Sequence, residues 1–227
     1  MSTQESLARE LRTPRSAAIA GILFALILGA VIVLLRAWGP ASEDGGTSWL
    51  ADQQRRSAVG LALNLVPFAG IAFLWFIGVI RGRLGEHEDK LFATVFLGSG
   101  LLFVALMFAA AAMIGSVLLL TTGPTPVATD SVRLAQSMGA ALLGTFGARM
   151  AAVFVLSVTT VGLRSRLVPR WLVVAGYVVA LGLLLSPPIS GWSQLLFPCW
   201  VLVLSIQILV SSPRDAGAGP GPGQVVG

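Results

Sequence analysis

The feature that most constrains this chain is a long apolar run, residues 136–163, which carries one charged side chain, Arg149. The run is followed at once by a basic turn that contains Arg164, Arg166 and Arg170. A helix rises about 1.5 Å per residue, so this run is long enough to cross the roughly 30 Å hydrocarbon core of a bilayer. Arginines gathered at one end are typical of the cytoplasmic end of a membrane span.

Composition extends this interpretation to the whole chain. Hydrophobic residues make up 56% of the 227 positions and charged residues only 11%. A soluble domain carries about a quarter charged residues, so this chain lacks the polar groups to cover its surface in water. We therefore predict an all-α, polytopic transmembrane helix bundle with the lipid bilayer as its main partner.

The apolar segments divide the chain into three parts. A polar N-terminal segment, 1–15, precedes a six-helix membrane domain, 16–210, and a Gly/Pro-rich tail, 211–227, that we expect to be disordered. The first apolar segment ends in Arg36 without a small-residue cleavage site, which favours a retained anchor over a signal peptide. The predicted spans are 16–35, 58–80, 91–120, 136–163, 171–185 and 192–210. The third is long and must tilt or protrude.

Basic residues predict the orientation of this bundle. With the N-terminus inside, ten of the 15 Lys and Arg residues fall on the cytoplasmic side and four on the other, and Arg149 lies within a span. This asymmetry predicts both termini in the cytoplasm. We expect the bundle to lie in the plasma membrane. Two tryptophans, Trp38 and Trp49, flank the first external loop, where we expect them in the headgroup layer.

Two short motifs carry a resemblance to a known group. The first span opens with Thr13-Pro14-Arg15, and a Ser-Arg-Leu-Val-Pro-Arg-Trp-Leu turn occupies 165–172. These motifs resemble a broad family of bacterial multi-pass membrane proteins known as a domain of unknown function. The resemblance implies a membrane location and a similar number of spans, and it implies no activity. A bias toward Ala, Gly and Arg is typical of high-GC bacteria.

Arg149 is the candidate functional residue, because it lies near the predicted bilayer midplane. A charge there costs about 2.5–3.5 kcal/mol on insertion scales. No predicted span contains an acidic residue. One hypothesis is a polar pocket in which Arg149, Asn64, Pro67 and Tyr177 bind an anion, a lipid headgroup or a carboxylate. The alternative is an arginine that locks helix packing or pairs with an acid of a partner subunit.

Small residues recur every four positions in the same segment, at Ala140, Gly144, Ala148 and Ala152. Such ladders let helices approach closely. We predict that this ladder mediates helix packing, within the chain rather than across a homodimer seam.

Several functions lack the residues they need. The single histidine, His87, and the single cysteine, Cys199, are too few for a metal site or an intrachain disulfide. Cys199 is expected to be a small buried side chain. No catalytic constellation or cofactor motif is visible, so we predict neither an enzyme nor a cofactor. The net charge of +5 comes from arginines between apolar runs, which argues against nucleic acid binding.

Two functions remain open at this point. We favour a structural or accessory membrane subunit, with a protein subunit or a second copy as its partner. The alternative is a small transporter-like or lipid- or anion-binding protein with a polar pocket around Arg149.

Overall fold

The computed structural model describes residues 14–39, 48–84, 90–121, 128–165, 169–185 and 191–211. Within these ranges all regular secondary structure is helical, which confirms the all-α class. The predictions for residues 1–13 and for the tail beyond Ser211 lie outside the described residues. Pro14 and Arg15 begin the first helix, and Ser211 ends the last.

Seven helices and three short helical pieces make up the described chain. Five segments are long and apolar enough to cross a membrane, which supports an integral membrane protein: Ser16–Trp38, Gln53–Arg81, Ala93–Leu120, Thr129–Leu163 and Trp192–Ser211. The remaining apolar helix, α7, has 16 residues and a length of about 24 Å. The elements are α2 Pro14–Trp38, η1 Ser48–Leu50, α3 Gln53–Leu84, α4 Lys90–Leu120, α5 Thr129–Ala141, η2 Leu142–Gly147, α6 Ala148–Ser165, α7 Arg170–Leu185, η3 Gly191–Leu195 and α8 Leu196–Ser211.

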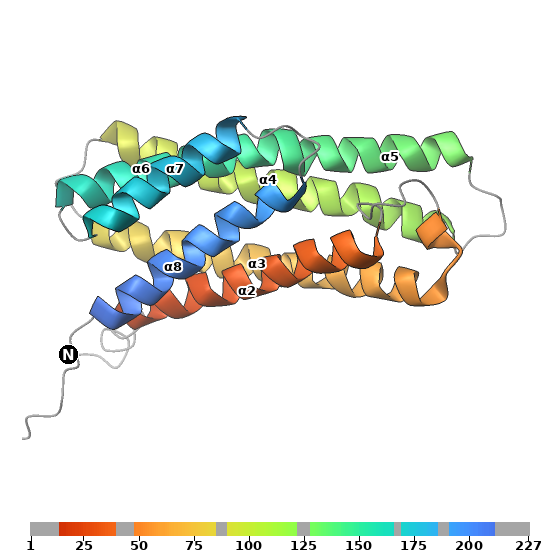
Figure 1. The fold of residues 1–227 in the computed structure, drawn as a ribbon, viewed down its shortest axis with the longest axis horizontal. Helices are drawn as coiled ribbons and strands as arrows, with labels where there is room; N and C mark the ends of the chain where they lie inside the picture. Colours follow the sequence, from red (N-terminus) through yellow and green to blue (C-terminus); the bar gives the residue numbers. More distant parts are fainter. Residues whose placement is uncertain are drawn as a thin grey trace, which may run out of the picture.

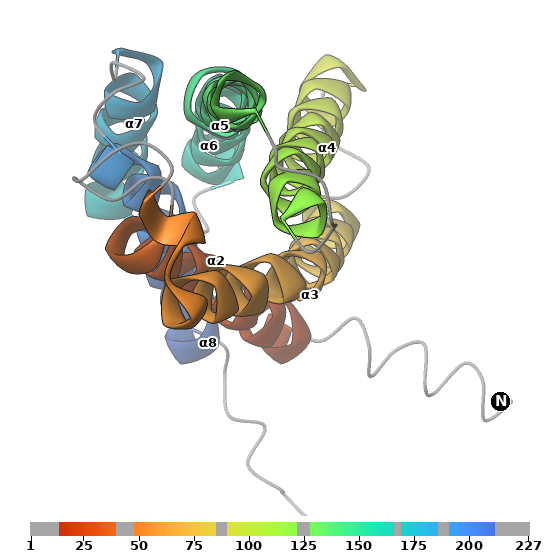
Figure 2. The same cartoon turned by 90° about the vertical axis from the view of Figure 1, so that its right-hand side faces the viewer.

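The helices form a closed ring in chain order. Helix α2 packs against α3 and α8, α3 packs against α4, and α4 packs against the α5–η2–α6 unit. Helix α6 then packs against α7, and α7 against α8, which returns the ring to α2. With α5, η2 and α6 counted as one unit, successive helices run in opposite directions, so the start of α2 and the end of α8 lie at the same end of the bundle (Figure 1). The view along the axis shows α4, α5–α6 and α7 facing α2 and α3 (Figure 2).

The predicted fourth span is one helical unit interrupted by a π-helical turn. It begins at Thr129, earlier than the predicted 136, and continues through η2 to Ser165. The Ala148 N–H donates to the Leu143 carbonyl, five residues earlier, which is the π-helical pattern. This turn forms a bulge in a helix that is otherwise continuous, and it ends two residues before the predicted functional arginine, Arg149.

Seven buried phenylalanines from five helices fill the centre of the ring. Phe73 lies at the middle of this aromatic core and contacts five other rings, the nearest at 4.4 Å between centroids. Offset and edge-on ring contacts of this kind add to the energy of apolar burial. The aromatic core consists of Phe24, Phe73, Phe76, Phe96, Phe103, Phe154 and Phe197. It joins α2, α3, α4, α6 and α8 through densely packed apolar side chains.

A second, smaller cluster lies where α3, α4 and α5 extend beyond the end of α2 (Figure 1). Trp49 is only 1% exposed there and packs among Val59, Val117 and Val132. The prediction that Trp49 lies in the headgroup layer is therefore wrong, because η1 turns its ring inward between three helices. The carboxylate of Asp52 accepts a hydrogen bond from the Gln54 N–H at 2.8 Å and caps the start of α3.

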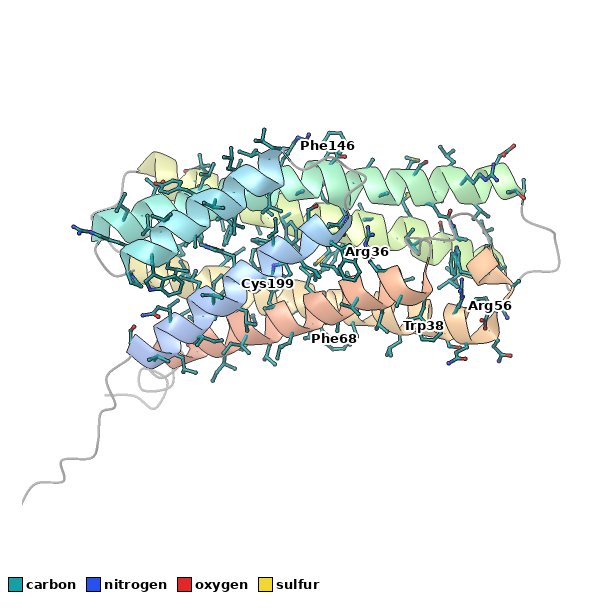
Figure 3. The ribbon with its side chains drawn as sticks, viewed as in Figure 1. Arg36, Trp38, Arg56, Phe68, Phe146 and Cys199 are labelled. Atoms are coloured by element: carbon teal, nitrogen blue, oxygen red, sulfur yellow. The ribbon has the colours of Figure 1, made fainter. Side chains whose placement is uncertain are left out.

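The outer faces of the bundle are apolar. Phe68 on α3 and Phe146 on η2 are more than half exposed and point outward on opposite sides (Figure 3). Exposed aromatic rings of this size on both sides suit a surface covered by lipid rather than by water.

Candidate functional site

Arg149 is half-buried at the start of α6, directly after the π-helical turn. Its Nη1 donates a 2.8 Å hydrogen bond to the Thr145 carbonyl, which belongs to the turn itself. Within the described residues no carboxylate pairs with it. The guanidinium therefore contacts its own helix, and it does not line the cavity described below.

Asn64 and Pro67 lie on an exposed face of α3. Pro67 has no N–H to donate to the Leu63 carbonyl. The Asn64 Nδ2 donates to the Gly60 carbonyl at 2.9 Å, within its own helix. Neither residue hydrogen-bonds to Arg149.

Tyr177 on α7 is partly exposed, and its hydroxyl lies 3.2 Å from the Thr160 hydroxyl of α6. Thr160 follows Arg149 by about 16 Å along the helix. The four residues predicted to form a polar pocket thus lie on three helices, and none of them hydrogen-bonds to another. The structure does not bring them together.

The small-residue ladder is divided between two environments. Gly144, Ala148 and Ala152 are buried inside the chain, whereas Ala140 is exposed and lines a cavity. The role of the ladder in helix packing stays a prediction. Cys199, predicted to be buried, is exposed on α8, because its neighbours Pro198 and Trp200 occupy the inner face instead.

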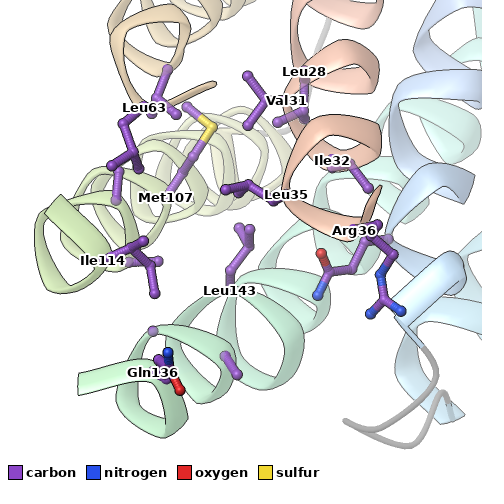
Figure 4. Close-up of a pocket in the computed structure, with 16 residues that line it drawn as sticks. Leu28, Val31, Ile32, Leu35, Arg36, Leu63, Met107, Ile114, Gln136 and Leu143 are labelled. Atoms are coloured by element: carbon purple, nitrogen blue, oxygen red, sulfur yellow. The ribbon is translucent and has the colours of Figure 1, made fainter. Parts of the chain in front are cut away.

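A cavity of about 160 Å³ lies between α2, α3, α4, α5 and η2 (Figure 4). Most of its lining is aliphatic, and Leu35, Met107 and Leu143 approach its middle from three elements (Figure 4). The apolar lining residues are Leu28, Val31, Ile32, Leu35, Leu63, Val66, Met107, Ala110, Ala111, Ile114, Gly139, Ala140 and Leu143. The volume is similar to that of a dry apolar cavity of about 150 Å³ that binds benzene.

Three polar residues complete the lining: Arg36 in the last turn of α2, Gln136 on α5 and Gln194 in η3. The Arg36 guanidinium lies over the Trp192 ring, 5.9 Å from its centroid, in the range of a cation–π contact. Figure 4 shows Arg36 and Gln136 at separate edges of the cavity, with Leu35 and Leu143 between them. The cavity therefore combines aliphatic walls with one positive charge and no negative charge.

The inner end of the cavity adjoins the aromatic core. Leu28 follows Phe24 by one helical turn, and Met107 follows Phe103 by one turn. One turn is about 5.4 Å, so the aromatic core begins about one turn beyond these two lining residues.

Arg36 was assigned no functional role from the sequence, because it was interpreted only as the residue that ends the first span on the outer side. A usable signal was present. Arg36 and Trp38 end the first span, while Trp192 and Gln194 begin the last, and a charge with aromatic partners at one interface can form a site. The sequence alone does not show that these two ends lie together, because that follows from the contact between α2 and α8 in the structure.

No family model, curated protein or solved structure matches this chain. Within the described residues no three His, Cys, Asp or Glu side chains lie close enough together to hold a metal ion. The site must therefore be interpreted from its own shape and charge.

Proposed function

We propose that this chain is a non-catalytic multi-pass protein of the plasma membrane that binds an amphipathic small molecule in the cavity beside Arg36. The proposal includes six crossings, with α7 as the sixth, and both termini in the cytoplasm. The observation that carries it is the cavity itself, which has aliphatic walls and a lone cationic group at one edge.

The position of the polar edge supports an amphipathic ligand. Helix α2 from Ser16 to Trp38 is about 34 Å long, close to the thickness of a hydrocarbon core. Arg36, Trp38 and Trp192 then lie together at the outer membrane–water boundary, where arginine and tryptophan are favoured. The cavity extends inward from that level, so its polar edge faces headgroups and its aliphatic walls lie at the depth of acyl chains.

The aromatic core supports binding rather than transport. A carrier has to open a path past its midplane site, and here seven packed phenylalanines occupy the centre of the ring. Opening such a path would separate rings that contact one another across five helices. A ligand that enters from the outer leaflet and leaves the same way requires no such rearrangement.

The test is site-resolved photolabelling of the protein in lipid nanodiscs. Two probes carry a diazirine near the end of a ten-carbon chain, one with a carboxylate head and one with a hydroxyl head. We expect saturable labelling of α2, α4 or α5 by at least one probe. Ala111→Leu and Leu143→Phe, which fill the cavity from opposite walls, are expected to reduce it at least tenfold.

The matched control is Ala112→Leu, because Ala112 neighbours Ala111 but faces outward. It should label like the native chain. Labelling that is not saturable, or that both filling variants leave unchanged, would contradict ligand binding in the cavity.

A structural or accessory subunit remains the second candidate, and the outer face of α3 favours it. Asn64 is exposed within the apolar segment 58–80, beside the exposed Leu61 and Phe68. Asparagine in a lipid-facing position promotes association between transmembrane helices. If a second copy packs there, Asn64→Leu should reduce the dimer seen by native mass spectrometry, whereas a monomer in both proteins would argue against this role.

A further inference from the structure

We infer that the ligand of this cavity is a single-chain anionic amphiphile, whose carboxylate or phosphate head binds Arg36 and whose tail lies against the aliphatic walls. This inference rests on the proposed function. It adds the charge of the ligand, the number of its acyl chains and its orientation in the cavity. It is carried by the charge of the lining and by the shape of its apolar part.

The charge of the lining selects an anion. Arg36 is the one charged residue among those that line the cavity, and within the described chain no carboxylate neutralises it. The other polar lining groups, Gln136 and Gln194, are uncharged amides. A positive charge that lacks an anionic partner at the edge of an apolar space favours a ligand that supplies the negative charge.

The orientation of the guanidinium leaves its donors available to a ligand. Trp192 lies against Arg36 as a cation–π partner, which restrains the guanidinium without using its N–H groups. The planar edge of a guanidinium fits the two oxygens of a carboxylate or phosphate. Lysine in this place would supply the charge but neither the stacking nor the paired donors.

The shape of the apolar part limits the tail to one chain. A cavity of about 160 Å³ is close in size to one that holds benzene, so it admits part of one chain rather than two. From Arg36 inward to Leu28 the distance along α2 is about 12 Å. The lining ends at Leu28 and Met107 on this side, and the packed aromatic core begins about one turn further along α2 and α4.

Chain length is therefore a measurable property of the site. A tail that enters from the bilayer gains packing contacts with each methylene that finds apolar wall, and gains none beyond the wall. Among straight-chain carboxylates of six to fourteen carbons, compared at equal amounts in the bilayer, we expect competition against the photoprobe to strengthen with length. It should level off once the tail extends past Leu28 and Met107.

The deciding experiment compares the carboxylate and hydroxyl photoprobes on the full-length protein in nanodiscs of neutral lipid. We expect the carboxylate probe to label the cavity at least tenfold more strongly than the hydroxyl probe. Arg36→Gln should reduce labelling by the carboxylate about 10- to 100-fold, the range for a charge-assisted hydrogen bond, and leave the hydroxyl probe unchanged. Arg36→Lys should restore part of the loss.

The matched control is Arg133→Gln, which removes the same charge from the exposed surface of α5 outside the cavity. It should bind both probes like the native chain. Dodecyl phosphate and dodecanoate as competitors distinguish the two head chemistries, and stronger competition by either one fits the inference. Dodecyltrimethylammonium should not compete.

The two proposals fail in different ways. Equal labelling by both probes, insensitive to Arg36→Gln but lost in Ala111→Leu, would overturn the anion inference and leave an amphiphile site. Labelling that Ala111→Leu and Leu143→Phe do not change would overturn the proposed function itself. The comparison of the two probes on the native chain needs no variant, so it decides the charge preference even if Arg36→Gln does not fold.

Discussion

A methyl group added at Gly176 of α7 tests how tightly this helix packs against its neighbours in the bundle. A Cβ built on Gly176 would lie 2.3 Å from the Thr159 Oγ1 and 3.1 Å from the Trp200 Nε1. These atoms belong to α6 and α8, so the methyl group would enter the contact between three helices. Overpacking of this kind costs about 1–3 kcal/mol.

A glycine on the same helix supplies the reference. At Gly182 the nearest atom to an added Cβ is the Leu196 Cδ1 at 3.4 Å, an ordinary contact. Both substitutions gain about 1 kcal/mol of helix propensity from replacing glycine with alanine. The difference in unfolding free energy between Gly176→Ala and Gly182→Ala therefore isolates the steric term, and we expect Gly176→Ala to be less stable by about 1–3 kcal/mol.

The assay is equilibrium unfolding in mixed micelles of dodecyl maltoside and sodium dodecyl sulfate, followed by far-ultraviolet circular dichroism. A double-mutant cycle with Thr159→Ala then tests the cause. The Thr159 hydroxyl is buried without a hydrogen-bond partner within the described chain, so its removal breaks no hydrogen bond. It also removes the two nearest obstacles to the new methyl group, and we expect a favourable coupling of about 1–2 kcal/mol.

Equal stability of Gly176→Ala and Gly182→Ala would refute the reasoning. It would mean that α7 does not pack against α6 and α8 as closely as the distances require. The proposal that α7 is a sixth membrane crossing would then lose its main support from helix packing.

Three further predictions test the core, the lone arginine and the topology. Phe73→Ala should lower the unfolding free energy by about 3–5 kcal/mol in the same assay, because five aromatic rings lose their central contact, and Phe73→Leu should cost less. Arg149→Leu should leave stability unchanged or higher, because its guanidinium hydrogen-bonds only to the Thr145 carbonyl of its own helix, and a loss above about 2 kcal/mol would contradict this. A green fluorescent protein fused after Arg214 should fluoresce, and an alkaline phosphatase fused there should be inactive, if the C-terminus is cytoplasmic.

The helical class was predictable because it depends on composition and segment length alone. A bilayer leaves few alternatives to helices for long apolar segments, since each backbone polar group must be satisfied within its own segment. Each predicted segment lies within one of the helices or continuous helical units of the structure. The helices extend further, as where α5 begins at Thr129 with polar residues that an apolar criterion leaves out.

The contacts of side chains could not be predicted from the sequence. Arg149 stands out in the sequence because it is a charge inside an apolar run. Its contact was not visible, since the Thr145 carbonyl belongs to a π-helical turn that no residue pattern marks. Trp49 was misplaced for a related reason, because a tryptophan beside a span fits an interface equally well whether its ring faces lipid or turns inward.

The cavity shows that small residues on facing helices do not always indicate close helix packing. A Cβ on Gly139 of α5 would lie 3.4 Å from the Ala110 carbonyl of α4, so these two helices do approach closely there. Both residues also line the cavity, together with the next residue on each helix, Ala140 and Ala111. A small side chain permits contact only where a neighbouring backbone comes near, and leaves space where it does not. Helix α2 lines the cavity from Leu28 to Arg36, and Arg36 in its last turn places a positive charge at the edge of that space.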